Sequence, residues 1–423
     1  MAFIFGIFLL TLLLVTLLSI RFKAPPFFSL LAGALFFGLA SGMNLDQTVV
    51  AILGGLGRVF AMFAIIILCG AIIAKILQGQ GMIEDLLGDL QTRARDRHTL
   101  AGTGGYLFAI PTTCCITAFM MLTPVLERLG RETSDSRPFL YLAAVGSVLS
   151  YTLIYPTPVV IPLFTGLGGG LSFLIYDLVA IPLSILLLVA VILVFRSGSG
   201  QSGREGTVIE GDCAGDPAVI HWKAWAPFLA ILLAIPVFSF GIPLSHESLI
   251  QCIMIAGLVV ALLLATPSAR VSGISSGTKH AGVIMFDICG AGALGNVIAA
   301  SGFLNQVFPA VTEAFPLVLI PFVFTALVQA AQGSRVVSAV ISSEVISGTA
   351  IAASMHPLPL ILSVAAGTCV ISYLSDPFFW LLQRTTGDSV SKVMKHYSLP
   401  LFICGLATFS AALVLHIALG APA

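Results

Sequence analysis

The chain has 423 residues, of which 58% are hydrophobic and 9% are charged, and its formal net charge is zero. Soluble domains carry about a quarter charged residues, so this composition excludes an ordinary soluble protein and indicates one embedded in membrane lipid. A chain without excess positive charge lacks the electrostatic footprint of a DNA- or RNA-binding protein, and we expect no nucleic-acid partner.

Apolar runs long enough to cross the hydrocarbon core recur along the chain. One helical crossing needs about 18–20 apolar residues, and the runs predict an all-α polytopic membrane protein with about 10–12 spans. Arg21 and Lys23 follow the first run instead of preceding it, which indicates an uncleaved span with its N-terminus outside. Simple spans are expected at residues 3–20, 25–43, 50–78, 138–160, 171–195, 222–242, 247–266, 279–300, 357–383 and 398–418.

Two further apolar segments contain polar residues in their middle. Residues 100–128 are interrupted by Pro111–Cys115 (PTTCC), and residues 314–352 are interrupted by Gln329–Arg335 (QAAQGSR). Non-helical backbone at membrane depth is tolerated only where protein or a water-filled cavity covers it. Each segment is therefore predicted to form a re-entrant hairpin.

The orientation of the spans is tested by the basic residues, because cytoplasmic loops are enriched in Lys and Arg. With the N-terminus outside, every basic cluster falls in a predicted cytoplasmic loop, so the first hairpin opens inward and the second opens outward. A Gly/Ser-rich stretch within residues 196–221 is predicted to be a flexible cytoplasmic linker. It separates a first half, residues 1–195, from a second half, residues 222–423.

The two halves also resemble each other in sequence. Residues 68–83 (LCGAIIAKILQGQGMI) match residues 288–304 (ICGAGALGNVIAASGFL), and residues 143–156 (AAVGSVLSYTLIYP) match residues 365–377 (AAGTCVISYLSDP). In each half, the first matched stretch precedes the hairpin and the second follows it. This order, in halves of opposite predicted orientation, indicates two inverted-topology repeats, the architecture of transporters that work by alternating access.

Charged side chains at predicted membrane depth are candidates for function, because such a charge costs about 2.5–3.5 kcal/mol. Arg335 lies at the tip of the second hairpin, and a guanidinium can bind a carboxylate through two parallel hydrogen bonds, so we predict that it anchors an anionic substrate. The alternative is a structural ion pair with Asp287, Glu344 or Asp376. Lys75 lies near the cytoplasmic end of its span, where its ammonium is expected to reach the interface.

A coupling-ion site is predicted around Asp376. This residue precedes Pro377, and a proline both lacks an N–H donor and disfavours helix at the residue before it. The break places free carbonyls beside a carboxylate, a set of oxygen atoms that suits a cation. We predict that Asp376, Ser375 and Asp287 bind the coupling ion, H⁺ or Na⁺, and the alternative for Asp376 is a cap on the following helix.

The tip of the first hairpin offers hydroxyl groups and backbone amides but no charge. Thr112, Thr113 and Cys114 are predicted to hold a carboxylate or hydroxyl of the substrate, although the hydroxyls could instead cap the second arm. No histidine shows metalloprotease spacing and no cysteine set shows zinc spacing, so we expect no enzymatic activity, no metal site and no bound cofactor.

Three segments resemble motifs of the gluconate permease (GntP) family of the ion transporter superfamily. They are the AQGS-type segment at 331–345 (AQGSRVVSAVISSEV), the glycine-rich helix at 288–302 (ICGAGALGNVIAASG) and the Asp motif at 372–387 (SYLSDPFFWLLQRTTG). The resemblance implies a symporter that takes up gluconate or another small hydroxy- or amino-carboxylate with a cation. It also implies an elevator-type transporter in the bacterial inner membrane, for which we expect a homodimer.

The chain departs from the family pattern near the implied site, which predicts a divergent member. Tyr155 and Tyr373 stand where the family has histidines, and Arg335 stands where it has a small residue. Besides the residues at the tip of the first hairpin, the predicted substrate-binding residues are Gln332, Gly333, Ser334, Arg335, Tyr155 and Tyr373. An anion channel, or an exchanger without cation coupling, is the alternative function.

Overall fold

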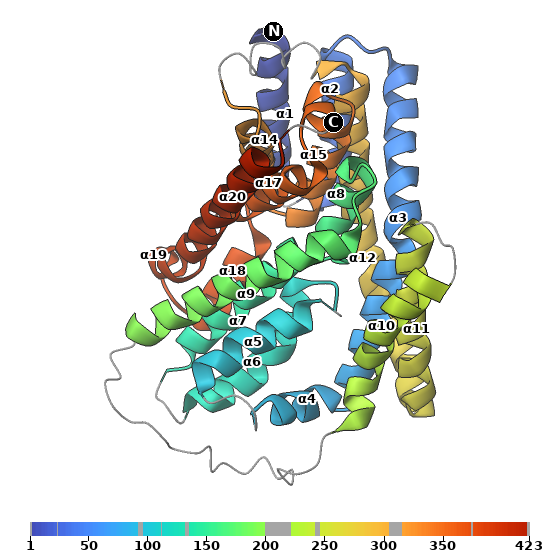
Figure 1. The fold of residues 1–423 in the computed structure, drawn as a ribbon. Helices are drawn as coiled ribbons and strands as arrows, with labels where there is room; N and C mark the ends of the chain where they lie inside the picture. Colours follow the sequence, from blue (N-terminus) through green and yellow to red (C-terminus); the bar gives the residue numbers. More distant parts are fainter. Residues whose placement is uncertain are drawn as a thin grey trace. The chain divides into compact units, whose positions relative to one another are not determined.

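Every element that the structure describes is a helix (Figure 1). The structure is a computed structural model, and it describes residues 2–22, 24–91, 96–110, 112–131, 135–198, 221–241, 246–303, 315–373 and 375–420. The predicted linker at 196–221 lies outside these ranges except at its ends. The all-α class predicted from composition is therefore confirmed for the described residues.

Four of the described helical stretches are long and apolar enough to cross a membrane. They are Leu45–Gly79, Phe173–Ser197, Pro267–Ala300 and Val390–Leu419. Several other apolar helices have only 10–17 residues, among them one arm of each predicted hairpin, Cys115–Pro124 and Leu319–Gln332. Short apolar helices are typical of membrane segments whose crossing is interrupted by a break.

The chain divides into two compact units. The first unit contains Met1–Ala64, Thr152–Leu183 and Val283–Ala423, and the second contains Ile65–Tyr151 and Ser184–Gly282. Both predicted halves, residues 1–195 and 222–423, contribute to each unit, and the division of the chain at the linker stays a prediction. Four of the described helices have residues in both units: α3 (Leu45–Gly79), α7 (Arg137–Leu153), α9 (Phe173–Gly198) and α12 (Pro267–Ala300).

In the first unit, α17 packs against α14 and α20, and α15 packs against α8. The core between them is formed by fully buried aliphatic and aromatic side chains, such as Leu360, Val364 and Phe378. The helices of this unit, besides those that the units share, are α1 (Ala2–Ile20), α2 (Pro26–Ala40), α8 (Val160–Leu167), α14 (Leu319–Gln332), α15 (Arg335–Ser347), α16 (Ala350–Ser354), α17 (Pro357–Val370), α18 (Pro377–Thr386), α19 (Val390–Val393), the π-helix η1 (Met394–Ser398) and α20 (Leu399–Leu419).

In the second unit, α5 and α6 pack against each other, as do α10 and α11. The short helix α4 is fixed by Asp89, whose carboxylate accepts hydrogen bonds from the backbone N–H of His221 at 3.0 Å and from Nε1 of Trp225 at 2.9 Å. Besides α3, α9 and α12, the helices of this unit are α4 (Met82–Gln91), α5 (Arg97–Ala109), α6 (Cys115–Arg131), α7 (Arg137–Leu153), α10 (Trp222–Gly241) and α11 (His246–Leu264).

Two predicted spans contain a helix break, and only the break at Asp376 and Pro377 was predicted from the sequence. In the span predicted at 138–160, α7 ends at Leu153 and α8 begins at Val160, and in the span at 357–383, α17 ends at Val370 and α18 begins at Pro377. Prolines explain both breaks, since each removes a backbone donor and restricts the residue before it. The breaks fall at the ends of the matched sequences 143–156 and 365–377.

Candidate functional site

The tip of the second predicted hairpin is a sharp turn between α14 and α15. Gly333 ends α14 in the left-handed conformation, with φ +69°, and Ser334 caps α15 by accepting a hydrogen bond from the backbone N–H of Val337 at 3.5 Å. A Cβ atom on Gly333 would overlap the carbonyl oxygen of Ser375. Gly333 is therefore required both for its conformation and for the close approach of the chain between α17 and α18.

The break between α17 and α18 lies directly against this tip. Asp376 caps α18, since its Oδ1 accepts a hydrogen bond from the backbone N–H of Phe378 at 2.9 Å, and Pro377 occupies the first helical position, where no N–H is needed. The hydroxyl of Ser375 donates to the carbonyl oxygen of Ala330 at 2.7 Å. Two helix breaks that are distant in sequence therefore meet in the first unit.

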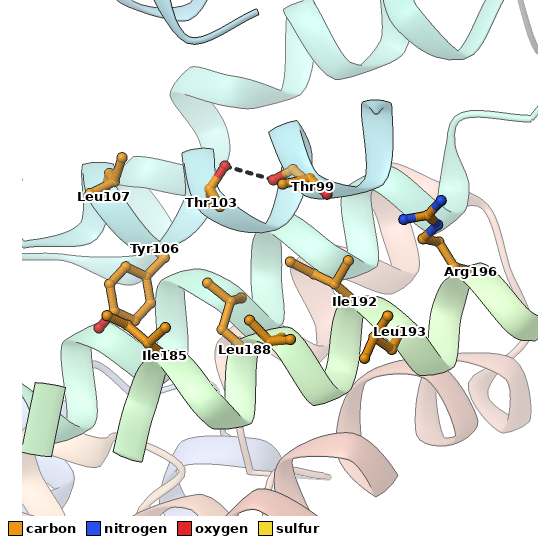
Figure 2. A pocket seen from close by; sticks show the side chains of 10 residues that line it. Thr99, Thr103, Tyr106, Leu107, Ile185, Leu188, Ile192, Leu193 and Arg196 are labelled. Atoms are coloured by element: carbon orange, nitrogen blue, oxygen red, sulfur yellow. Dashed lines mark hydrogen bonds between the residues drawn. The ribbon is translucent and has the colours of Figure 1, made fainter. Parts of the chain in front are cut away.

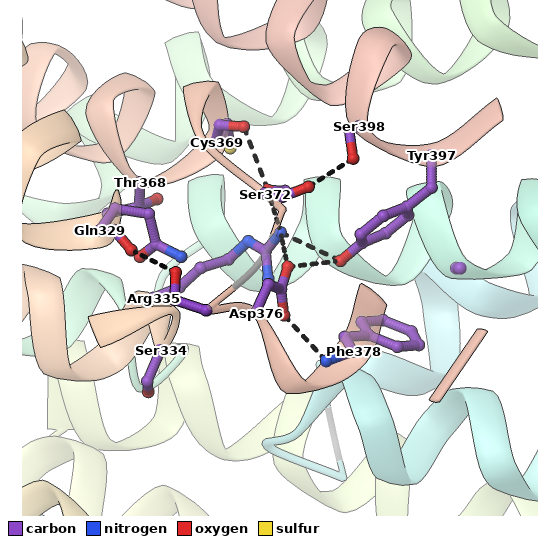
Figure 3. Close-up of polar contacts among 12 residues, drawn as sticks. Gln329, Ser334, Arg335, Thr368, Cys369, Ser372, Asp376, Phe378, Tyr397 and Ser398 are labelled. Atoms are coloured by element: carbon purple, nitrogen blue, oxygen red, sulfur yellow. Dashed lines mark hydrogen bonds and ion pairs between the residues drawn. The ribbon is translucent and has the colours of Figure 1, made fainter. Parts of the chain in front are cut away.

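Arg335 and Asp376 form a buried ion pair at this meeting point (Figure 3). Nη2 of Arg335 lies 3.2 Å from Oδ2 of Asp376, 2.7 Å from Oγ of Ser372 and 3.1 Å from Oη of Tyr397. The hydroxyl of Tyr397 lies 3.1 Å from the same carboxylate oxygen. The side chains of Arg335 and Asp376 are 4% and 1% exposed, so the pair is enclosed almost completely.

Arg335 therefore pairs with one of the three carboxylates that the sequence offered as alternatives. Of the other two, Glu344 pairs with Arg58, and Asp287 accepts a hydrogen bond from the backbone N–H of Phe27 at 3.3 Å. Enclosing one charge without its partner would cost several kcal/mol, whereas the pair as a whole is neutral. The charge of Arg335 is thus balanced inside the first unit.

Two partners of this ion pair were missed by sequence reasoning. Ser372 lies three residues before Ser375 of the predicted ion site, and its main-chain oxygen accepts a hydrogen bond from the hydroxyl of Ser398. Tyr397 lies in the π-helix η1, directly before the last apolar helix. From the sequence alone, a tyrosine at this position is typical of a membrane interface. The π-helix, a feature common at functional sites, is what distinguishes Tyr397 from an ordinary interface tyrosine.

Of the remaining predicted residues of the first unit, Gln332 has its amide nitrogen buried without a hydrogen-bond partner among the described residues. Tyr155 donates its backbone N–H to Asp177 at 3.0 Å, and its ring stacks on Phe173 with centroids 5.2 Å apart. The ring of Tyr373 packs edge-on against Phe379 at 5.3 Å. Both tyrosines thus flank the helix breaks of their own segments.

The tip of the first predicted hairpin belongs to the second unit, and its side chains are used for capping. The hydroxyl of Thr112 lies 2.7 Å from a carbonyl oxygen in the last turn of α5 and 3.2 Å from the carbonyl oxygen of Cys114, directly before α6, so its shorter hydrogen bond is to the first arm. Thr113 has φ +50°, a conformation uncommon for any residue except glycine. The sulfur of Cys114 accepts a long hydrogen bond, 3.5 Å, from the backbone N–H of Thr117 in the first turn of α6.

A cavity of about 350 Å³ lies between α5 and α9 in the second unit (Figure 2). Aliphatic side chains such as Leu188 and Ile192 form most of its wall, and Arg196 at one end is paired with Asp96 at 3.1 Å. No predicted site residue lines this cavity. Within the described ranges, no group of three or more His, Cys, Asp or Glu side chains could hold a metal ion.

Relatives of the chain are membrane transporters. The high-affinity gluconate transporter of Escherichia coli (strain K12) is 23% identical over 428 residues, which cover 93% of this chain and 95% of that protein. The gluconate permease of Pseudomonas aeruginosa is 24% identical and covers 92% of each chain. The D-serine transporter DsdX of Escherichia coli (strain K12) is 23% identical and covers 96% of this chain and 97% of its own.

Solved structures with the same fold are also transporters. The YdaH transporter of Alcanivorax borkumensis superposes with a TM-score of 0.62 at 13% identity, over 94% of this chain and 99% of its own. MtrF of Neisseria gonorrhoeae, from a class of antimetabolite efflux pumps, gives a TM-score of 0.57 at 12% identity, over 91% and 94%.

The resemblance seen in the three sequence motifs is confirmed across most of the chain. The model of the GntP family permeases matches residues 3–199 and 234–418. Its members are transporters and not enzymes, as the sequence predicted. The chain therefore belongs to the GntP permease family of transmembrane transporters.

Proposed function

We propose that the protein is a secondary active symporter that carries a small hydroxy- or amino-carboxylate together with H⁺ or Na⁺ by alternating access. The names of the relatives support this substrate class, because gluconate and D-serine are both small carboxylates with a polar group on the carbon beside the carboxylate. We place the protein in the bacterial inner membrane with its N-terminus outside, as a homodimer with an elevator-type mechanism.

The observation that carries this proposal is the buried ion pair of Arg335 and Asp376 at the meeting of two helix breaks. When a cation or proton neutralises Asp376, the guanidinium loses its counter-ion and becomes available to the carboxylate of the substrate. Loading both ligands therefore replaces one neutral pair by two neutral pairs. Loading only one ligand leaves an unpaired charge in the protein interior.

This charge balance provides a physical reason for obligate coupling. A buried charge without its partner costs several kcal/mol, so the empty and the doubly loaded states are the ones that can close and move across the membrane. Asp376 would hold the cation together with Ser375, whose hydroxyl already lies against the α14 carbonyls. Asp287 is proposed as a second acidic group for the same ion.

The other substrate contacts are proposed from the ends of helices. The backbone N–H of Ser334 lies at the start of α15, where the helix dipole favours an anion, and Gly333, whose own N–H donates to the carbonyl oxygen of Gln329, forms the turn before it. In the second unit, the N–H groups of Thr112 and Thr113 and the protons of their hydroxyls are all donated within the tip, so the two hydroxyls are proposed to accept hydrogen bonds from the substrate and Cys114 to donate its backbone N–H. The matched segments that end at helix breaks in both halves support the inverted repeat that alternating access requires.

Transport by purified protein in proteoliposomes tests the proposal. Radiolabelled gluconate and D-serine are supplied outside, with either a pH gradient or a sodium gradient as the driving force. We expect accumulation against the concentration gradient with one of the two cations. Leakage of either anion down its gradient, without accumulation and without counterflow, would instead support the channel.

The variant Asp376→Asn sharpens this experiment, because a neutral amide imitates the cation-loaded carboxylate. It should abolish accumulation driven by the cation gradient but retain counterflow exchange of the labelled anion. Asp388→Asn is the matched control, since Asp388 lies in the same unit and pairs with the exposed Lys392 at 3.5 Å. Loss of cation-driven accumulation in both variants would contradict the special role of Asp376.

A further inference from the structure

Gln329 is a fully buried amide without a hydrogen-bond partner. Its side chain is 0% exposed, and neither Oε1 nor Nε2 bonds to any residue that the structure describes. Nearly all buried polar atoms of native proteins are satisfied, so an exception of this kind requires an explanation. A leucine of similar volume would fill the position without leaving a donor and an acceptor unused.

The backbone of Gln329 is held where the two helix breaks meet. Its carbonyl oxygen accepts hydrogen bonds from the N–H of Gly333 at 2.8 Å and from the hydroxyl of Ser375 at 3.4 Å. Figure 3 shows its side chain beside Arg335. Gln332 lies three residues later, on the same side of the last helical turn, and its amide nitrogen is also buried without a partner in the described chain.

The chemistry of an amide differs from that of the ion pair beside it. Arg335 can only donate hydrogen bonds and ionised Asp376 can only accept them, whereas a glutamine side chain does both. A hydroxyl group also donates and accepts, and an ammonium group donates. The acceptor of Gln329 is therefore suited to either substituent, and its donor is suited to a hydroxyl or to a carboxylate oxygen.

We propose that Gln329 recognises the 2-hydroxyl or 2-ammonium group of a substrate whose carboxylate is held at Arg335. Gln332 donates its amide to the same carboxylate. This assignment rests on the proposed function and makes Gln329 a specificity-determining residue that the sequence motifs did not indicate. Its burial agrees with transport by alternating access, in which the protein encloses the substrate away from water on both sides.

The test compares paired ligands in wild type and in Gln329→Leu. The probes are D-gluconate with 2-deoxy-D-gluconate, and D-serine with 3-hydroxypropanoate, which lacks the ammonium group. Dissociation constants are measured on the purified full-length protein. We expect wild type to bind one parent compound about ten- to a hundredfold more tightly than its analogue, the range for one hydrogen bond that involves a charged group or leaves a partner unpaired.

Gln329→Leu should lose this preference. It should bind the parent compound as weakly as wild type binds the analogue, with no further loss for the analogue itself. The apo variant should melt at the same temperature as wild type or higher, because an unsatisfied buried amide has been removed. Gln383→Leu is the control: its amide donates to the carbonyl oxygen of Asp388 at 3.2 Å, so this variant should melt earlier yet keep the ligand preference.

The outcomes separate two failures. If wild type prefers a parent compound and Gln329→Leu keeps that preference, the role of Gln329 is refuted while the proposed substrate class stands. A variant that melts much earlier and still discriminates would show a structural amide, which also refutes the role. If wild type binds none of the four probes, the proposed substrate class fails, and the inference fails with it.

Discussion

Removal of one partner from the Arg335–Asp376 pair should destabilise the protein strongly. Asp376→Asn keeps an oxygen that can cap α18 but leaves the guanidinium without a counter-ion, and Arg335→Met leaves the carboxylate with Tyr397 and one backbone N–H. Both side chains are almost fully enclosed, so each single change should cost about 3–5 kcal/mol of the free energy of unfolding.

The double variant Arg335→Met/Asp376→Asn removes both charges and should lose about 2–3 kcal/mol less than the sum of the two single variants. Chemical denaturation in detergent micelles measures these free energies. The control is Asp388→Asn with Lys392→Met, a pair in which the lysine is 59% exposed, and its coupling should stay below about 1 kcal/mol. Additive effects within about 0.5 kcal/mol at the buried pair would refute the reasoning.

Two further predictions concern a turn and a pH dependence. Gly333→Ala should cost more than about 2 kcal/mol, since its Cβ meets a main-chain oxygen, whereas Gly387→Ala, with φ +66° but open space around it, should cost about 1 kcal/mol; equal effects on thermal unfolding would contradict this. The pKa of His221 is raised by its hydrogen bond to Asp89, and the pKa of Asp89, which burial raises, is lowered on balance by hydrogen bonds from His221 and Trp225. The stabilisation of the folded protein by protonated His221 is complete below the ordinary histidine pKa of 6.5, and it is lost as the pH rises through the higher pKa of the folded state. The melting temperature of wild type should therefore fall above pH 6.5, and His221→Asn should make this fall smaller. An unchanged pH profile in the variant would refute the contact.

Local rules of backbone chemistry predicted the helix breaks at the second tip. Gly333 followed by Ser334 ends one helix and begins another, and Asp376 followed by Pro377 gives a cap and a first helical residue. These signals need only the neighbouring residues, so they can be read from one sequence. The same rules apply to the prolines after Leu153, where we nevertheless expected a continuous span, because the apolar run itself is unbroken.

The partners of Arg335 could not be predicted in the same way. Asp287, Glu344 and Asp376 are equally plausible by charge and depth, and only the packing of α15 against α17 decides which of them lies within reach. Tyr397 lies in a π-helix, which no local sequence pattern predicts. The Thr112 hydroxyl bonds to the last turn of the first arm, whereas the alternative considered for it was a cap on the second arm; a side chain at a tip can reach either helix end.

The central claim is that a cation on Asp376 releases Arg335 to the substrate carboxylate. The most direct measurement is the dissociation constant of gluconate and D-serine as a function of sodium concentration and of pH, in wild type and in Asp376→Asn. We predict that wild type binds one of these anions more tightly as one of the two cations rises, and that Asp376→Asn binds it tightly at every cation concentration. An identical cation dependence in the two proteins, or none in wild type, would contradict the claim.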